Sequence, residues 1–163
     1  MVIDAAKVSS VAHPSQAEIA KVAELLGRRP ESDFEVVVVD SSGEPVVIRN
    51  GPIMANGRPM PTRYWLVGRE LSRLVARLEG DGGVRAAELA VDADDLTATH
   101  ERYAAERDSQ IPTEYVGPRP TGGVGGTRQG VKCLHTHLAH HLAVGDDPVG
   151  EWVIRQLEAT DLV

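Results

Sequence analysis

The sequence runs Phe34-Glu35-Val36-Val37-Val38-Val39, then Asp40-Ser41-Ser42-Gly43-Glu44, then Pro45-Val46-Val47-Ile48. The first and third segments are short and rich in β-branched residues, which favour strands, and the middle segment has the composition of a turn. Together they predict a β-hairpin. Asn56-Gly57 is a second turn signal, and residues 63–67 are expected to form a third strand. Because the connections are too short for crossover helices, we expect a small antiparallel sheet.

Helical patterns lie on both sides of this sheet in the sequence. Ser15 and Glu18 form a capping box and Gly27 is a typical helix stop, which together predict a helix over residues 15–26. After the sheet, helices are expected over residues 71–78, 84–108 with a break near 92–94, 131–144 and 148–159. The expected fold class is therefore α+β: an N-terminal helix, a small antiparallel β-sheet and a C-terminal cluster of about four helices.

The length of the chain bounds its organisation. With 163 residues, one domain spanning residues 1–163 is expected. Residues 1–14 precede the first predicted helix and are expected to be flexible. Residues 112–130 hold three Pro and six Gly, which predict a long loop without regular structure. Long loops inside small domains are often functional.

The composition excludes several classes of protein. A single cysteine cannot form an internal disulfide framework, and no apolar run approaches the roughly 18 residues that a membrane span needs. The N-terminus lacks the basic flank and apolar stretch of a signal peptide. We therefore expect a cytoplasmic protein without membrane insertion. The 24 acidic residues outnumber the 17 basic ones, which disfavours nucleic acid as a partner.

The charge is unevenly distributed along the chain. Residues 115–145 contain no Asp or Glu, although they hold Arg119, Arg128, Lys132 and four of the six histidines. An electropositive region in an acidic protein attracts anions or an acidic partner. The plainer explanation is a loop followed by an apolar helix, neither of which needs carboxylates.

The histidines concentrate in the segment Lys132–Leu142. On a continuous helix, at about 100° per residue, Cys133, His137 and His140 share one face, and His141 lies beside them. A thiolate and imidazoles are the ligands that zinc prefers. We therefore predict a metal site, with zinc as the cation, formed by Cys133, His137, His140 and His141.

Other interpretations of this segment stay open. Three ligands on one straight helix converge poorly, so a further ligand is expected from His100, Asp146 or Asp147. The first alternative is that Cys133 and the histidines serve packing and hydrogen bonding, since both residue types are often buried. The second makes Cys133 a nucleophile, because a helix N-terminus and nearby cationic side chains would lower its pKa.

A glycine-rich segment, Gly122–Gly130, precedes the same helix. Its backbone N–H groups could hold an anion together with Arg128 and Lys132. It is not a Walker loop, because Cys133 stands where Ser or Thr is required. One face of the preceding predicted helix is expected to support the site, and it carries His100, Tyr103 and Arg107.

Several segments between about residues 26 and 150 carry a family resemblance: Leu26-Gly27-Arg28-Arg29-Pro30, Pro61-Thr62-Arg63-Tyr64-Trp65-Leu66, His100-Glu101-Arg102-Tyr103, Val131-Lys132-Cys133-Leu134-His135 and Asp147-Pro148-Val149-Gly150. Together they resemble an actinobacterial family, the domain-of-unknown-function 501 family. The resemblance implies a bacterial protein without an established activity, and relatives' gene neighbourhoods imply a division-related protein partner. Relatives tend to carry cysteines in the hairpin region and after the third strand, where this chain has none.

These observations favour a cytoplasmic, non-enzymatic or regulatory domain that binds a metal ion, an anion or a protein partner through residues 128–141. The alternative is an enzyme, either a metal-assisted hydrolase or a thiol enzyme, centred on Cys133, His137 and His140. An enzyme needs titrating groups that converge on a water-accessible pocket. A binding module needs an exposed apolar or basic patch instead.

Overall fold

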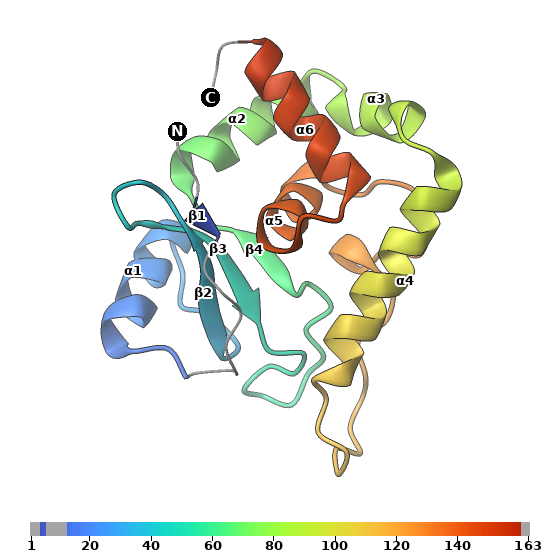
Figure 1. The fold of residues 1–163 in the computed structure, drawn as a ribbon. Helices are drawn as coiled ribbons and strands as arrows, with labels where there is room; N and C mark the ends of the chain where they lie inside the picture. Colours follow the sequence, from blue (N-terminus) through green and yellow to red (C-terminus); the bar gives the residue numbers. More distant parts are fainter. Residues whose placement is uncertain (1–3, 6–12, 161–163) are drawn as a thin grey trace.

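The sheet in the computed structural model, which describes residues 4–5 and 13–160, has four antiparallel strands (Figure 1). In spatial order these are β1 (Asp4–Ala5), β2 (Phe34–Val39), β3 (Pro45–Asn50) and β4 (Tyr64–Leu66). The predicted hairpin and third strand are confirmed, and β1 adds a two-residue pairing with β2. The flexibility expected for residues 1–14 falls mostly on residues that lie outside the described ranges.

The helices follow in nearly the predicted order. They are α1 (Gln16–Leu26), α2 (Arg69–Gly80), α3 (Gly83–Ala90), α4 (Ala93–Ser109), α5 (Leu134–Val144) and α6 (Pro148–Ala159), with a 3-10 turn, η1, at Val124–Gly126. The predicted capping box at Ser15 and Glu18 is present at the start of α1. The expected break near residue 92 separates α3 from α4, because the Asp92 side chain caps α4 by accepting from two backbone N–H groups. The fold is therefore α+β, as predicted.

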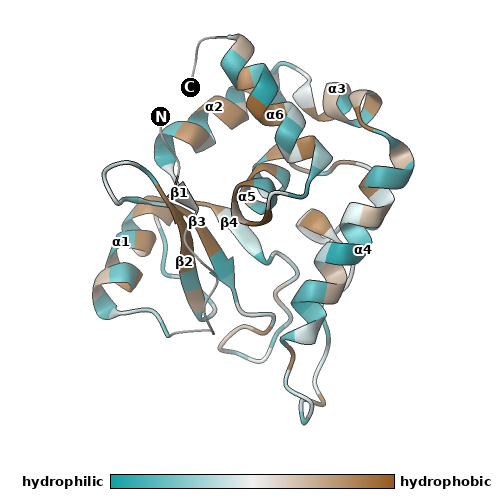
Figure 2. Ribbon diagram, in the orientation of Figure 1, coloured by the Kyte–Doolittle hydropathy of each residue, from teal (hydrophilic) through white to brown (hydrophobic). Residues whose placement is uncertain are grey.

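The sheet is buried on both faces, which explains why its strands are continuous apolar runs rather than alternating ones. Successive side chains point to opposite faces, and Ile48 packs with Val22 of α1 in one cluster. Its neighbour Val47 belongs to the larger cluster that includes Leu134 and Leu138 of α5. Hydrophobic residues accordingly follow β2, β3 and the inner part of α5 (Figure 2). Helix α5 thus lies between the sheet and the other C-terminal helices (Figure 1).

Helix α5 begins at Leu134, three residues later than the predicted start at residue 131. Carboxylates from α2 and α3 hold the preceding backbone outside the helix. Glu88 accepts a hydrogen bond from the Val131 N–H at 2.9 Å, and Glu79 accepts one from the Leu134 N–H at 2.6 Å. Cys133 is therefore the extended residue before the first turn, with φ −156° and ψ 123°, and its side chain caps nothing.

Candidate functional site

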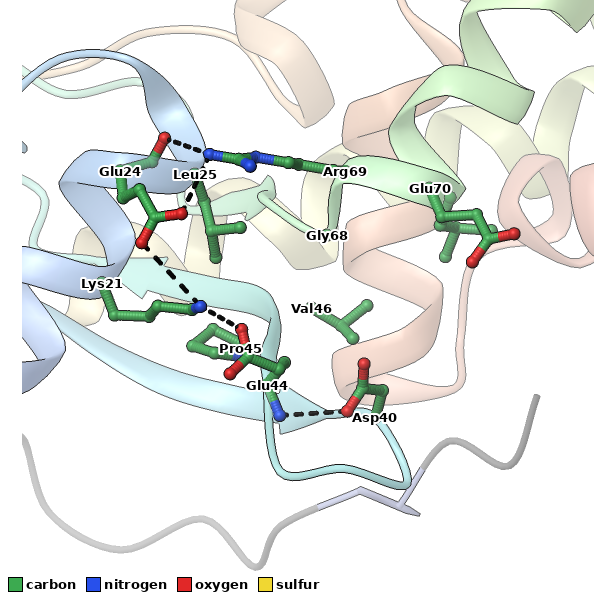
Figure 3. A pocket seen from close by; sticks show the side chains of 11 residues that line it. Lys21, Glu24, Leu25, Asp40, Glu44, Pro45, Val46, Gly68, Arg69 and Glu70 are labelled. Atoms are coloured by element: carbon green, nitrogen blue, oxygen red, sulfur yellow. Dashed lines mark hydrogen bonds and ion pairs between the residues drawn. The ribbon is translucent and has the colours of Figure 1, made fainter.

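A hollow of ≈ 240 Å³ between α1, the β2–β3 turn and the start of α2 is rich in charged side chains (Figure 3). The cations in it already have partners among its carboxylates. Lys21 pairs with Glu44, and the Arg69 guanidinium donates to the carboxylate and the carbonyl of Glu24. These ion pairs join α1 to the strand β3 and to α2, so the hollow has a structural explanation.

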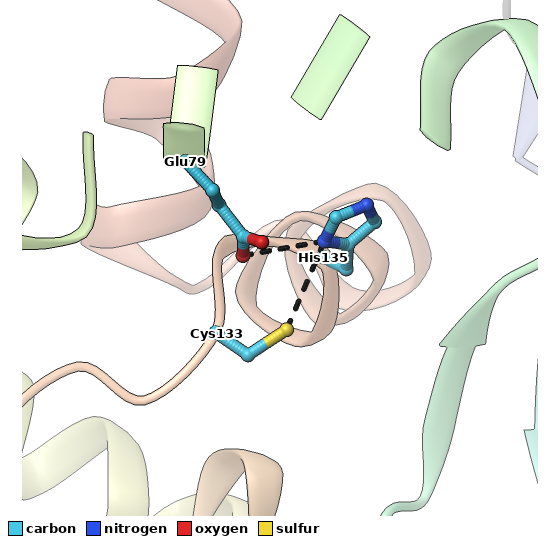
Figure 4. A group of neighbouring side chains, drawn as sticks. All are labelled: Glu79, Cys133 and His135. Atoms are coloured by element: carbon cyan, nitrogen blue, oxygen red, sulfur yellow. Dashed lines mark hydrogen bonds and ion pairs between the residues drawn. The ribbon is translucent and has the colours of Figure 1, made fainter. Parts of the chain in front are cut away.

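A second group of chemically active side chains gathers where the end of α2 meets the start of α5. Glu79, Cys133 and His135 each offer one ligand atom, and these atoms lie within 4.8 Å of one another (Figure 4). The His135 Nδ1 atom is 3.2 Å from Glu79 Oε1 and 3.8 Å from Cys133 Sγ. All three side chains are half-buried. Among the described residues, this is the one group of three or more His, Cys, Asp and Glu side chains that converge closely enough to hold a metal ion.

The two nitrogens of the His135 ring have separate partners. Nε2 lies 2.9 Å from the Ser72 carbonyl oxygen, which only accepts, so this nitrogen carries a hydrogen. Nδ1 is the nitrogen that faces both the thiol and the carboxylate (Figure 4). The ring is thereby fixed in orientation by α2, with its second nitrogen aimed at the other two groups.

The cluster is electrostatically coupled. Burial opposes a charge on His135, but the hydrogen bond with Cys133 and the Glu79 carboxylate outweigh it and raise the pKa of His135 to about 9. With a proton on Nδ1, His135 forms an ion pair with Glu79 beside the Cys133 side chain, at the start of α5. A divalent cation in place of that proton would have the same three atoms as ligands, because metal ligation requires deprotonated donors.

Two of the three spacings in the cluster fit a tetrahedral cation. With zinc bond lengths of about 2.0–2.3 Å, neighbouring ligand atoms lie roughly 3.3–3.6 Å apart. The two distances from His135 Nδ1, 3.2 Å and 3.8 Å, differ from that range by only a few tenths of an ångström. The types of side chain are also suitable for zinc, since thiolate, imidazole and carboxylate are all zinc ligands. Three protein ligands leave one coordination position for another group.

His137 and His140 have a different environment, although they are on the same helix. Both direct Nδ1 at Asp147, with closest N–O distances of 2.9 Å. Asp147 also accepts from the Val149 and Gly150 N–H groups and caps α6. A carboxylate only accepts, so each imidazole donates from Nδ1. We call these three side chains the inner network: Asp147, His137 and His140.

The inner network is deeply buried and electrostatically tight. The side chains of Asp147 and His137 have no solvent exposure. Burial works against the carboxylate charge, but the hydrogen bonds from His137 and His140 prevail and hold the pKa of Asp147 far below its usual range. The His140 ring also contacts those of Tyr64 and Tyr103, at centroid distances of 5.5 Å and 5.1 Å. The network therefore anchors α5 to α6 and to the sheet.

The structure separates the residues that the helical projection grouped. Cys133 precedes the helix and contacts His135, whereas His137 and His140 point to Asp147. The Nε2 atom of His137 and the Nδ1 atom of His141 are buried without a hydrogen-bond partner in the described part of the chain. The projection was wrong in placing Cys133 on the helix, because carboxylates of α2 and α3 hold the backbone N–H groups of Val131 and Leu134, and Cys133 between them is extended.

The other residues considered as ligands also have partners. Asp146 pairs with Arg102 on α4, at 2.8 Å. His100 uses both nitrogens, since Nδ1 accepts from the Val124 N–H at 3.1 Å and Nε2 lies 3.0 Å from the Gly130 carbonyl. Burial lowers the pKa of His100. His100 is thereby a neutral histidine that holds the glycine-rich segment against α4.

The face expected to support the site proves to be structural. The Tyr103 hydroxyl accepts from the Arg63 N–H at 2.5 Å, and burial raises the Tyr103 pKa. Arg107, only 1% exposed, donates to the carbonyls of Pro61 and Gly122 and to Asp108. These contacts join α4 to the segment before β4 and to the long loop.

The two residues predicted to bind an anion do not line one site. Arg128 borders a hollow of ≈ 250 Å³ together with Arg107 and Gly122. Lys132 is exposed and does not border that hollow. The anion site therefore stays a prediction from the sequence.

Sequence reasoning missed Glu79, His135 and the Ser72 carbonyl. Glu79 lies 54 residues before Cys133, and nothing in the local pattern connects the two. On a continuous helix that includes Cys133, His135 would fall next to the leucine stripe and away from the Cys133 face. The one usable signal is the short spacing Cys133-Leu134-His135, which brings thiol and imidazole together when the first residue is extended.

Comparisons with known proteins add the family. No helix in the described ranges is long and apolar enough to cross a membrane. Neither the curated proteins nor the solved structures give a match to this chain. A family model described as "Protein of unknown function (DUF501)" matches residues 36–155, so the resemblance is confirmed and the chain belongs to this family.

Proposed function

We propose that this protein is a non-enzymatic domain that binds one divalent transition-metal cation through Glu79, Cys133 and His135, with zinc as the best match. One observation carries the proposal: a thiol and a carboxylate approach the same nitrogen of one imidazole, Nδ1. A metal site requires several donor atoms around one position, and the thiol, the carboxylate and the imidazole nitrogen supply three of them. Cys133 belonged to the metal site predicted from the sequence, and Glu79 and His135 replace the other ligands.

The same observation argues against thiol catalysis at Cys133. In a nucleophile–histidine–acid relay, the nucleophile and the acid contact opposite nitrogens of the ring. Here Glu79 and Cys133 share Nδ1, and Nε2 is occupied by the Ser72 carbonyl. That last contact is what a metal-ligating histidine usually makes, since its second N–H is held by a carbonyl or carboxylate.

A cation at this position would connect two helices. Glu79 belongs to α2, whereas Cys133 and His135 stand at the start of α5. Binding would therefore strengthen the α2–α5 contact, which supports a structural or regulatory role. A cytoplasmic location and a division-related protein partner stay predictions.

The test is metal content, measured by mass spectrometry on untagged protein purified without a nickel column. Glu79→Gln keeps a hydrogen-bond acceptor for the Leu134 N–H but removes the charged ligand. Glu88→Gln is the matched control, because Glu88 holds the Val131 N–H in the same way and lies outside the cluster. We expect close to one zinc per chain in the wild type and in E88Q, and at least a tenfold lower content in E79Q and in Cys133→Ala.

Cobalt substitution gives an independent readout. A Co²⁺ ion bound by the Cys133 thiolate produces a sulfur-to-cobalt charge-transfer band, and C133A must lack it. Wild-type protein that takes up neither zinc nor cobalt when supplied at micromolar concentration would overturn the proposal. So would a metal content equal in E79Q and E88Q.

A further inference from the structure

A groove runs beside β4, between the end of α1 and the starts of α2 and α5. It consists of two hollows, of ≈ 420 Å³ and ≈ 230 Å³, that lie next to each other and share Leu26 and Leu66 in their walls. We call it the β4 groove. Its apolar floor is centred on Leu26, Trp65 and Leu66, and its rim carries Arg28, Arg69 and Arg73.

The charge of the β4 groove is opposite to that of the protein. The chain has 24 acidic residues and a net charge of −7, yet no Asp or Glu borders either hollow. Arg28 and Arg69 have carboxylate partners just outside the lining, whereas Arg73 has none among the described residues, so the wall carries an excess of positive charge, which favours an anionic occupant. The arginines and the apolar floor are separate from Glu79 and Cys133, and His135 alone of that cluster borders the smaller hollow.

The rim arginines differ in how available they are to a ligand. Arg73 is exposed and forms no ion pair within the described residues. Arg28 lies over the Trp65 ring, 5.0 Å from its centroid, and pairs with Glu31, while Arg69 is held by Glu24 of α1. The Arg28–Glu31 pair is exposed, and such pairs contribute little free energy, so a ligand carboxylate can replace Glu31.

The backbone of β4 adds a second kind of recognition. β4 is the last strand in the sheet order, so its outer side has no strand partner among the described residues. The Arg63 carbonyl and the Val67 N–H bond to β3, and antiparallel pairing alternates. The N–H and C=O of Leu66 therefore point away from β3, toward the side where an extended peptide could pair.

We propose that the β4 groove docks an extended segment of a partner protein that alternates apolar and acidic residues. Its apolar side chains would cover Trp65 and Leu66, its Asp or Glu side chains would meet Arg28 and Arg73, and its backbone would pair with Leu66. An extended occupant fits because residues of a strand alternate between two faces. A floor of partly buried apolar side chains supplies affinity, and the arginines supply selectivity for acidic sequences.

The test is selection of binding peptides from a random 16-residue display library, followed by affinity measurement with the enriched synthetic peptides. Trp152→Phe leaves Trp65 as the single tryptophan, so its fluorescence reports occupation of the groove. We expect enrichment of sequences that combine Asp or Glu with apolar residues. Arg28→Glu with Arg73→Glu should weaken their binding at least about tenfold, and binding should fall as salt rises.

Arg85→Glu is the matched control, since Arg85 is exposed on α3 and borders neither hollow; it should change the affinity less than about twofold. Circular dichroism and thermal unfolding check that each variant is folded. The proposal is overturned if the enriched peptides lack acidic residues, or if R85E and the double variant change the affinity equally. It is also overturned if no peptide binds and the protein binds vesicles that contain anionic lipid instead. Peptide binding must also persist in chelator, where no metal ion is bound. The result of the peptide experiment is therefore independent of the result of the metal experiment.

Discussion

Helix α5 places histidines in two different environments within two turns. His135, at its start, shares Nδ1 with a thiol and a carboxylate that are half-buried. His137 and His140, further along, donate to one buried carboxylate that is also a helix cap. The same residue type thus belongs to a half-buried cluster with a thiol and a carboxylate at one end, and to a buried network around Asp147 at the other, in which His137 Nε2 has no partner among the described residues. The difference teaches that the chemistry of a histidine depends on which groups face its nitrogens, and not on its helical spacing.

The largest expected effect is loss of the inner network. Asp147→Ala leaves the Nδ1–H groups of two buried imidazoles unpaired and removes the cap of α6. Breaking a buried, charged network of this kind costs about 3–5 kcal/mol. The matched control is Asp92→Ala, which removes the exposed cap of α4 and should cost only about 1 kcal/mol. Urea unfolding measures both.

Where D147A is too unstable for a complete transition, Asp147→Asn gives a milder version that keeps one acceptor oxygen. The midpoint for D147N should then lie between those of the wild type and D147A. Equal midpoints for D147A and D92A would mean that the buried histidines add nothing to a simple cap, and the contrast between the two ends of α5 would disappear.

The second expected effect is acid destabilisation through His100, which packs against the inner network at a ring distance of 5.7 Å from His137. Burial lowers the pKa of His100, with His137 and His140 adding repulsion while the Gly130 hydrogen bond and the Asp147 charge oppose the shift. The folded state thus resists a proton that the unfolded chain accepts near pH 6.5. The stability due to neutral His100 is present above that pH and is lost as the pH falls below it.

His100→Gln isolates this contribution, because the amide can accept from Val124 and donate to Gly130 without titrating. The two proteins differ at no other titratable residue. Between pH 7.5 and 5.5, the free energy of unfolding should fall more steeply in the wild type than in H100Q. Parallel curves would show that His100 takes up its proton equally in the folded and the unfolded state.

Much of the fold could be predicted, because its signals are local. The capping box at Ser15, the hairpin at residues 34–48 and the cap at Asp147 depend on residues within a few positions of one another. The start of α5 could not, since Glu79 and Glu88 lie 43 residues or more away and determine where the helix begins. A shift of three residues is enough to move Cys133 off the helix and change its neighbour from His137 to His135.

The candidate site was predicted in part for the same reason. The sequence identifies Cys133 and a histidine-rich helix, since these residue types are rare and close together. It does not reveal that Asp147 occupies the Nδ1 atoms of His137 and His140. The groups that face each ring nitrogen are set by tertiary contacts, and they distinguish His137 and His140, which donate to a capping carboxylate, from His135, which faces a thiol and a carboxylate.

The smallest expected effect on stability concerns the start of α5, where Cys133 lies. Cys133→Ala removes a half-buried thiol that caps nothing and whose contact with the His135 ring is long, at 3.8 Å. In chelator, where no cation contributes, the free energy of unfolding should fall by less than about 1 kcal/mol, as for most substitutions outside a packed core. A fall above about 2 kcal/mol, measured by the same urea unfolding, would identify Cys133 as a packing residue. The informative result is a small fall in the free energy of unfolding in chelator and a larger fall when zinc is supplied to both proteins. Only stability that depends on a ligand follows the occupancy of its site. This result would therefore show that a cation stabilises the start of α5, whereas Asp147 stabilises its other end.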